Sequence, residues 1–189
     1  MIGDLNNFSI DIVMPNYNSA KYLSDTIESV LSQTFKNWKL IIVDDHSDLE
    51  TQEILKKYES HENINIIWLE ENKRAAYCRN LAMKKSKSEY IAFLDSDDIW
   101  YENKLTIQLD YIKKYNLVCS LSNKIDEKGL MIYEESTVSD QLIDLSALVM
   151  RNKIVHSSVV VHKNLFLSIM FDEDKLLNGL ENRFLQIIT

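Results

Sequence analysis

Short apolar runs alternate with amphipathic stretches along the first part of the chain. Runs rich in apolar and β-branched residues predict strands at residues 9–15, 38–45, 64–70 and 90–95. Apolar residues recurring at helical spacing predict helices at residues 19–33, 49–58, 75–85 and 103–115. Ser19 is expected to cap the first of these helices. Because nearly continuous apolar strands alternate with helices, the pattern predicts an α/β fold whose parallel sheet is covered on both faces.

The pattern becomes mixed after residue 116. A hairpin turn is expected at residues 126–129, and strands are expected at residues 117–123, 130–135 and 154–162. Apolar residues at helical spacing predict two more helices, at residues 140–150 and about 176–188. The last part of the chain is therefore expected to extend the α/β region rather than repeat it.

Length and composition fit one globular unit. The chain has 189 residues, 46% of them hydrophobic and 26% charged, with only three Gly and one Pro. A chain of this length can bury a core of its own, and so few Gly and Pro argue against long linkers. We therefore expect a single domain over residues 1–189, with a nucleotide-binding half at about residues 8–123 and a mixed extension at about residues 124–189.

The charge of the chain narrows the classes of partner. The formal net charge is −8, from 21 basic and 29 acidic residues, and the sequence has no block of Lys and Arg. Sequence-independent binding of nucleic acid depends on cationic side chains that neutralise phosphates, so this composition argues against it. An anionic ligand would need a local cationic group or a metal ion.

Cysteine usage and the N-terminus indicate the compartment. Cys78 and Cys119 form no metal-binding motif and are expected to be reduced, as in the cytosol. The first residues lack the basic and apolar regions of a signal peptide, and no uncharged apolar run approaches the ~20 residues that span a bilayer. We expect a soluble, cytoplasmic protein, and peripheral contact with the cytoplasmic face of a membrane stays open.

Distinctive polar groups follow three of the predicted strands. The segments are Pro15-Asn16-Tyr17-Asn18, Asp44-Asp45-His46-Ser47 and Asp95-Ser96-Asp97-Asp98. Ligands of open parallel sheets bind beyond the carboxyl ends of the strands, and in the common order 3-2-1-4 the first and fourth strands are neighbours. Clustered carboxylates suit Mg²⁺ or Mn²⁺. The alternatives are a solvated turn at residues 95–98 and helix capping by Asp44 or Asp45.

Four segments together resemble a known family. VMPNYN at residues 13–18, IIVDDHSD at 41–48, NKRAAYCRN at 72–80 and FLDSDDIW at 93–100 occur in the order and spacing typical of family 2 of inverting glycosyltransferases. The resemblance implies the GT-A fold, a Rossmann-like, mostly parallel sheet flanked by helices with a small acceptor-side extension. It also implies metal-dependent transfer of a sugar, with inversion, from a nucleotide diphosphate sugar to a glycan or lipid-linked saccharide. A UDP-linked donor and a role in bacterial surface polysaccharide biosynthesis are the favoured expectations.

The resemblance also implies residues that bind the nucleotide. Pro15 and Tyr17 would line the base pocket, with Tyr17 stacked on uracil. Asp44 would accept a hydrogen bond from the base. Arg79 would approach the base or the diphosphate.

Further residues are implied for the metal, the sugar and catalysis. Asp95 would face the ribose or the metal, and Asp97 would ligate the Mn²⁺ or Mg²⁺ that bridges the diphosphate. Asp98 and Trp100 would lie near the donor sugar. Glu181 would be the general base that accepts the proton of the attacking hydroxyl.

The chain departs from the family pattern at two points. Arg74 stands where the family usually has Gly, so that loop either approaches phosphate less freely or contacts it through Arg74. The late motif reads Leu180-Glu181-Asn182 in place of the family's acidic pair, so Glu181 could fill either acidic position. The chain stops at Thr189, soon after that motif, and we expect either a short member or a truncated one.

Two other functions remain open from the sequence. Asp44, Asp45 and Asp95 have the spacing of the acids in a phospho-acceptor receiver domain, although a whole strand–helix unit precedes the acidic pair here and no later Lys lies at the expected distance. A nucleotide-sugar-binding protein without catalysis is the second alternative. His156 and His162, six residues apart on a predicted strand, are expected to share one face as core or surface residues, with a metal role less favoured.

Overall fold

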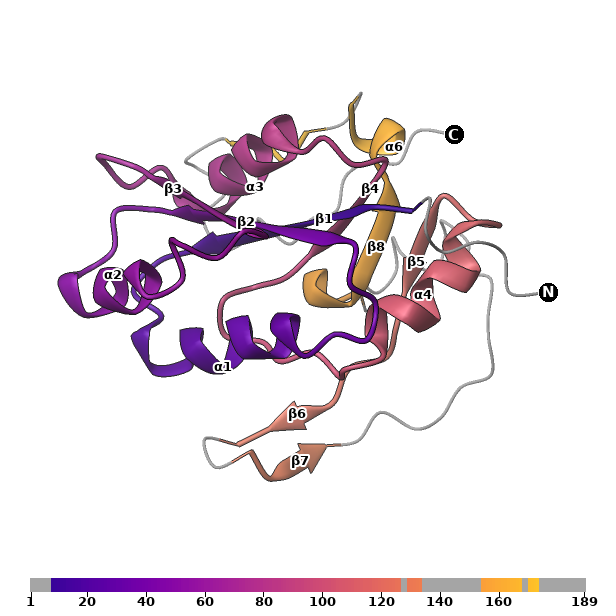
Figure 1. Cartoon of the computed structure of the whole chain (residues 1–189), viewed down its shortest axis with the longest axis horizontal. Helices are drawn as coiled ribbons and strands as arrows, with labels where there is room; N and C mark the ends of the chain where they lie inside the picture. The colour runs from indigo at the N-terminus through magenta and orange to yellow at the C-terminus, as the bar shows by residue number, and fades with distance from the viewer. Residues whose placement is uncertain (1–7, 127–128, 134–153, 168–169, 174–189) are drawn as a thin grey trace.

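The structure, a computed structural model, describes residues 8–126, 129–133, 154–167 and 170–173, and its centre is a six-stranded sheet (Figure 1). The sheet order is β3-β2-β1-β4-β8-β5. Its strands are β1 (Ile10–Asn16), β2 (Trp38–Asp44), β3 (Ile64–Trp68), β4 (Tyr90–Phe93), β5 (Leu117–Cys119) and β8 (Val159–His162). The first four strands are parallel to one another, in the predicted order 3-2-1-4, which confirms the α/β fold.

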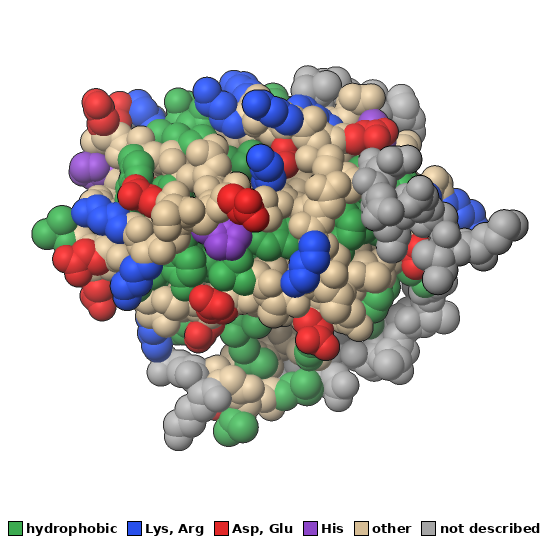
Figure 2. Space-filling view, in the orientation of Figure 1, with side chains coloured by type: hydrophobic (Ala, Val, Ile, Leu, Met, Phe, Trp, Pro, Cys, Tyr) green, Lys and Arg blue, Asp and Glu red, His purple; other side chains and the backbone are tan. Residues whose placement is uncertain are grey.

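A strand from late in the sequence, β8, completes the sheet. β8 lies between β4 and β5 and is antiparallel to both. The sheet therefore extends past the boundary expected near residue 123. β6 (Lys124–Ile125) and β7 (Met131–Tyr133) form a separate hairpin, whose turn places Gly129 at a φ of 76°. Apolar side chains of this hairpin are exposed, and Figure 2 shows green side chains at the lower edge where it lies.

Helices cover both faces of the sheet (Figure 1). α1 (Ala20–Leu31), α2 (Leu49–Lys56) and α4 (Lys104–Ile112) lie on one face, and α3 (Arg74–Lys85) and α6 (Lys163–Leu167) lie on the other. Within the described residues, none of the helices is both long and apolar enough to cross a membrane. Acidic and basic side chains are interspersed on the face viewed in Figure 2.

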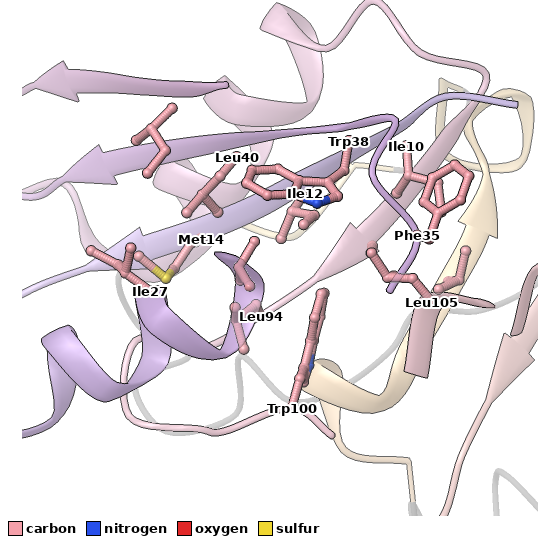
Figure 3. Close-up of a cluster of buried hydrophobic side chains, with 14 of the residues drawn as sticks. Ile10, Ile12, Met14, Ile27, Phe35, Trp38, Leu40, Leu94, Trp100 and Leu105 are labelled. Carbon is pink, nitrogen blue, oxygen red and sulfur yellow. The ribbon is translucent and has the colours of Figure 1, made fainter. Parts of the chain in front are cut away.

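Two apolar clusters hold the layers together. Successive residues of β1 point to opposite faces, so Ile12 and Met14 belong to one cluster and Val13 to the other. The first cluster also contains Trp38 and Leu105, which pack with β1 in Figure 3. Because β1, β2 and β4 are buried on both faces, packing fixes these strands and the points at which their carboxyl-end loops begin.

Several predicted boundaries differ from the structure. The helix expected over residues 103–115 is α4, which ends at Ile112. The strand expected over residues 154–162 begins as a short 3₁₀ turn, η2 (His156–Ser158), before β8. Ser19 precedes α1 as expected, but its hydroxyl donates to the Asn16 side chain and makes no capping bond. The helices expected at residues 140–150 and 176–188 lie outside the described residues.

Candidate active site

The loops that follow β1 and β2 are joined by buried hydrogen bonds. Asn16, at the end of β1, donates through Nδ2 to Asp44 Oδ1 at 2.7 Å, and its carbonyl accepts from the Asp45 amide at 2.8 Å. The Ser47 hydroxyl accepts from the Asn18 amide at 3.0 Å. The role of Asn16 could not be predicted, since an amide in a turn motif has many ordinary uses. These bonds fix the two loops relative to each other.

The predicted base-pocket residues lie at this junction. Pro15 is buried within β1, beside Val43 of β2, and Tyr17 projects from the loop with 53% of its surface exposed. Asp44 is 1% exposed, and its second oxygen accepts from the Ser47 amide at 3.1 Å. Tyr17 is therefore accessible to a base, whereas Asp44 would have to use its remaining lone pairs. The base contacts of Pro15, Tyr17 and Asp44 stay predictions.

Asp45 caps α3, a different helix from the one expected. Its two carboxylate oxygens accept from the backbone amides of Lys73 and Arg74 at 2.6 and 2.7 Å. The helix that directly follows β2 is capped instead by Asp48, which accepts from the Thr51 amide at 2.9 Å. Asp45 thus connects the end of β2 to the start of α3.

The acidic loop, residues 95–98, follows β4 and binds α3 through an ion pair. Arg79 Nη2 lies 2.6 Å from Asp95 Oδ1, and the Arg79 side chain is only 6% exposed. The Asp95 side chain is 29% exposed, so removing one partner is expected to cost about 3 kcal/mol, the lower end of the range for buried pairs. The sequence placed Arg79 and Asp95 in separate motifs, and the structure brings them together. The predicted approach of Arg79 to a base or diphosphate stays a prediction.

His156 lies beside this pair. Its Nδ1 is 4.0 Å from Asp95 Oδ2, and the side chain is buried. Burial first, and the Arg79 charge second, lower the pKa of His156 to about 4, although the Asp95 charge opposes them. His156 is therefore neutral near pH 7 and adds no full charge to the loop. The expectation that His156 and His162 share a strand face is wrong, because His156 belongs to the η2 turn.

The three carboxylates of the acidic loop have different surroundings. Asp98 Oδ2 accepts a short hydrogen bond from the Ser157 hydroxyl, whereas Asp97 is exposed and has no partner among the described residues. Burial, with the charges of Asp95 and Asp97, raises the pKa of Asp98, while the Ser157 hydrogen bond lowers it. The loop therefore contains one Arg-paired, one Ser-bonded and one solvent-facing carboxylate.

Trp100 has a packing role that the sequence did not predict. It is 5% exposed, its indole Nε1 donates to the Ser157 carbonyl at 2.7 Å, and its ring lies 3.9 Å from Lys104 Nζ. In Figure 3 it lies within the first apolar cluster. The ring has almost no accessible surface, and the predicted place of Trp100 beside a donor sugar stays a prediction.

The residues present fit a divalent cation only if another group completes its coordination. The described part of the chain contains no group of three or more His, Cys, Asp or Glu side chains that could hold a metal. The acidic loop nevertheless offers an exposed, hard oxygen ligand in Asp97, within a region of repelling carboxylates. One or two carboxylates plus substrate phosphates are a usual Mg²⁺ site. The predicted base, Glu181, lies outside the described residues.

Comparison with known proteins gives one family. A family model described as glycosyl transferase family 2 matches residues 11–165. The chain is 41% identical over 114 residues to TuaG of Bacillus subtilis, a glycosyltransferase assigned to teichuronic acid biosynthesis; the match covers 60% of this chain and 45% of TuaG. It is 40% identical over 113 residues to Escherichia coli WfgD, named as a UDP-Glc:alpha-D-GlcNAc-diphosphoundecaprenol beta-1,3-glucosyltransferase, covering 60% of this chain and 44% of WfgD. The chain thus spans less than half the length of these curated relatives.

Solved structures share the fold. The S. aureus TarS structure in complex with UDP matches with a TM-score of 0.72 at 22% identity, over 93% of this chain and 53% of that one. The mannosyltransferase PcManGT from Pyrobaculum calidifontis, in complex with GDP-Man and Mn²⁺, matches with a TM-score of 0.66 at 14% identity, over 90% and 50% of the two chains. At these identities the likeness establishes the GT-A fold alone.

Proposed function

The chain belongs to glycosyl transferase family 2, and we propose that it transfers a hexosyl group, with inversion at the anomeric carbon, from a nucleoside diphosphate sugar to an acceptor hydroxyl. A UDP-linked donor is favoured because WfgD is named for UDP-Glc and TarS was crystallised with UDP. A glycan or lipid-linked saccharide is the favoured acceptor, since WfgD is named for a diphosphoundecaprenol-linked sugar. Surface polysaccharide biosynthesis is the process that this acceptor suggests.

The proposal depends on one observation, that the three carboxylates of the acidic loop have different partners. Asp95 is neutralised by Arg79, Asp98 is bound by Ser157, and Asp97 faces solvent. A solvent-facing carboxylate at the carboxyl end of a parallel strand is where a ligand of an open sheet approaches. Asp97 is therefore the residue proposed to meet the donor's charged end.

Mn²⁺ or Mg²⁺ is proposed as the cofactor, held by Asp97 with Asp95 beside it. Bound with the donor, such a cation would neutralise the negative charge that develops on the departing diphosphate. The protein's own part is to hold Asp97 in place and to fix the Asp95 carboxylate through its ion pair with Arg79.

The remaining roles concern positioning and proton transfer. Tyr17, half-exposed at the end of β1, is proposed to stack on the base. Glu181 is proposed to accept the proton of the acceptor hydroxyl as the hydroxyl attacks the anomeric carbon. Its role rests on the family resemblance alone.

Thermal unfolding with donor analogues tests the proposal. UDP-glucose, GDP-mannose and the corresponding diphosphates would each be added with and without Mn²⁺. We expect one nucleotide class to stabilise the protein. At a ligand concentration 100-fold above Kd the gain is about 2.7 kcal/mol, or roughly 5–10 °C in a domain of this length. Mn²⁺ should increase the shift.

Asp97→Ala is the decisive variant, and Asp110→Ala is its control. Asp97→Ala should lose the metal-dependent part of the shift. Asp110 is an exposed acid on α4, 3.7 Å from Lys113, and its removal should leave the shift unchanged. Equal shifts with and without Mn²⁺ in the native protein would count against a metal-assisted transferase.

The same purified protein can be used to test the two alternative functions, a phospho-acceptor domain and a binding protein without catalysis. A phospho-acceptor domain needs a reactive carboxylate, whereas Asp95 is engaged by Arg79; labelling of Asp95 by acetyl phosphate would favour it. A binding protein without catalysis would give the thermal shifts but release no UDP from UDP-glucose in the presence of acceptors.

A further inference from the structure

Ser157 lies between two of the three carboxylates of the acidic loop, although it belongs to none of the four motifs. Its hydroxyl oxygen accepts from the Asp95 amide at 2.9 Å, and the same hydroxyl donates to Asp98 Oδ2. The residue is 6% exposed, so water has little access to either bond. One hydroxyl group therefore fixes both the backbone at the start of the loop and a side chain at its end.

The turn that carries Ser157 is itself held from the α4 side of the sheet. The Ser157 carbonyl accepts from Trp100 Nε1, and the neighbouring Ser158 carbonyl accepts from Gln108 Nε2, each at 2.7 Å. Gln108 is in turn oriented by Lys104, whose Nζ donates to Gln108 Oε1 at 2.7 Å. The backbone of the turn that carries Ser157 is thus held by buried groups that lie outside the acidic loop.

The loop would present its charge differently without this hydroxyl. Asp98 would lose its hydrogen-bond donor and keep the repulsion of Asp95 and Asp97, which favours a different side-chain position. The Asp95 amide would lose its acceptor at the point where the loop leaves β4. Both changes would alter where Asp97 lies relative to the end of β1.

We propose that Ser157 is a positioning residue of the donor site, which holds Asp98 inward and anchors Asp95 so that Asp97 alone presents its carboxylate to a cation and a nucleoside diphosphate. This inference rests on the proposed function. It assigns to the turn before β8 a part in donor binding that the sequence expectation gave to residues 8–123. Ser157 does not touch the reacting atoms, and it acts through the acidic loop.

Ser157→Thr and Ser157→Val form the matched pair that tests the inference. The two side chains have nearly the same shape, and only Thr retains the hydroxyl, so any shared steric cost cancels. The first measurement is the Kd for Mn²⁺ in the presence of UDP, by electron paramagnetic resonance, with GDP as a second arm. We expect Ser157→Val to bind about tenfold more weakly than Ser157→Thr, since hydrogen bonds to charged groups are the stronger class.

The second measurement needs no ligand. Hydrogen exchange at the Asp95 amide should be at least about tenfold faster in Ser157→Val than in Ser157→Thr, because only Thr offers an acceptor. If Ser157→Val does not fold, Ser157→Ala, which adds no bulk, is compared with the native protein in both measurements.

The outcomes separate the two ideas. Equal Mn²⁺ affinities in the Thr and Val variants, beside clear binding by the native protein, overturn the role of Ser157 and leave the proposed function standing. Failure of the native protein to bind Mn²⁺ with either UDP or GDP overturns the proposed function, and the inference with it. Weaker Mn²⁺ binding and faster exchange of the Asp95 amide in Ser157→Val, but not in Ser157→Thr, support both the proposed function and the role of Ser157.

Discussion

Arg74 begins α3 with a backbone conformation that suits glycine. Its φ is 73°, in the left-handed region, where an L-residue with a Cβ pays about 1–2 kcal/mol. The other non-glycine residues with positive φ in the described part of the chain are Asn18 and His46, and Asn tolerates this region more readily. The Arg74 amide donates to Asp45 Oδ2 at 2.7 Å, so the cap holds the residue in this conformation.

Two substitutions, Arg74→Gly and Arg74→Ala, test this conformation. Both delete the guanidinium and its contacts, and only Gly removes the Cβ. Glycine's greater freedom in the unfolded chain offsets about 0.5–1 kcal/mol of the relief. We therefore expect Arg74→Gly to be more stable than Arg74→Ala by about 0.5–1 kcal/mol, or roughly 1–4 °C in Tm.

Urea unfolding followed by circular dichroism measures the difference. The control pair is Lys84→Gly and Lys84→Ala, at an exposed position near the other end of the same helix. There the order should reverse, with Ala more stable by about 0.8–1 kcal/mol. A result in which Ala exceeds Gly at both positions would refute the left-handed conformation of Arg74 and, with it, the geometry of the Asp45 cap.

Two further predictions concern buried charges. Burial lowers the pKa of Lys104 to about 7, well below its unfolded value near 10.5. Between these two pH values the unfolded state binds more protons than the folded state. The free energy of unfolding should therefore rise by up to about 1.4 kcal/mol per pH unit. Lys104→Met should abolish that rise in urea unfolding at pH 7 to 9.5, and parallel pH profiles for the two proteins would contradict this. Asp45→Ala leaves the Lys73 and Arg74 amides without their acceptor and should lower the free energy of unfolding by about 3 kcal/mol, whereas Asp45→Asn, which keeps one acceptor, should lose less; similar losses in the two variants would refute the cap.

Periodicity predicts the parallel half of the fold because each buried strand there is followed by its own amphipathic helix. The strand ends that carry Asn16, Asp44 and Asp95 were expected at one edge of the sheet, and the order β3-β2-β1-β4 brings them there. The place of β8 was not predictable, because an apolar run does not reveal which strand it will pair with.

The sequence predicted which residue types gather at the site better than it predicted which residues contact one another there. The clustered carboxylates after β4 are visible in the sequence. Which of them is paired and which faces solvent depends on Arg79 and Ser157, which belong to other elements. Asp45 was expected to cap the next helix and caps α3 instead, since local sequence does not show which amides a carboxylate will reach. Trp100 was expected near the donor sugar from the family resemblance, and its place after the acidic motif did not show that its ring is buried.

The insertion of β8 between β4 and β5 also sets an order of events during synthesis. β5 leaves the ribosome well before β8, yet β8 is the strand to which β5 is hydrogen-bonded within the described sheet. Until residues 159–162 emerge, one edge of β4 is unpaired and β5 has no partner strand in the described sheet. Unpaired strand edges can form hydrogen bonds with other chains. A nascent chain stalled short of that point would expose this edge to chaperones and proteases.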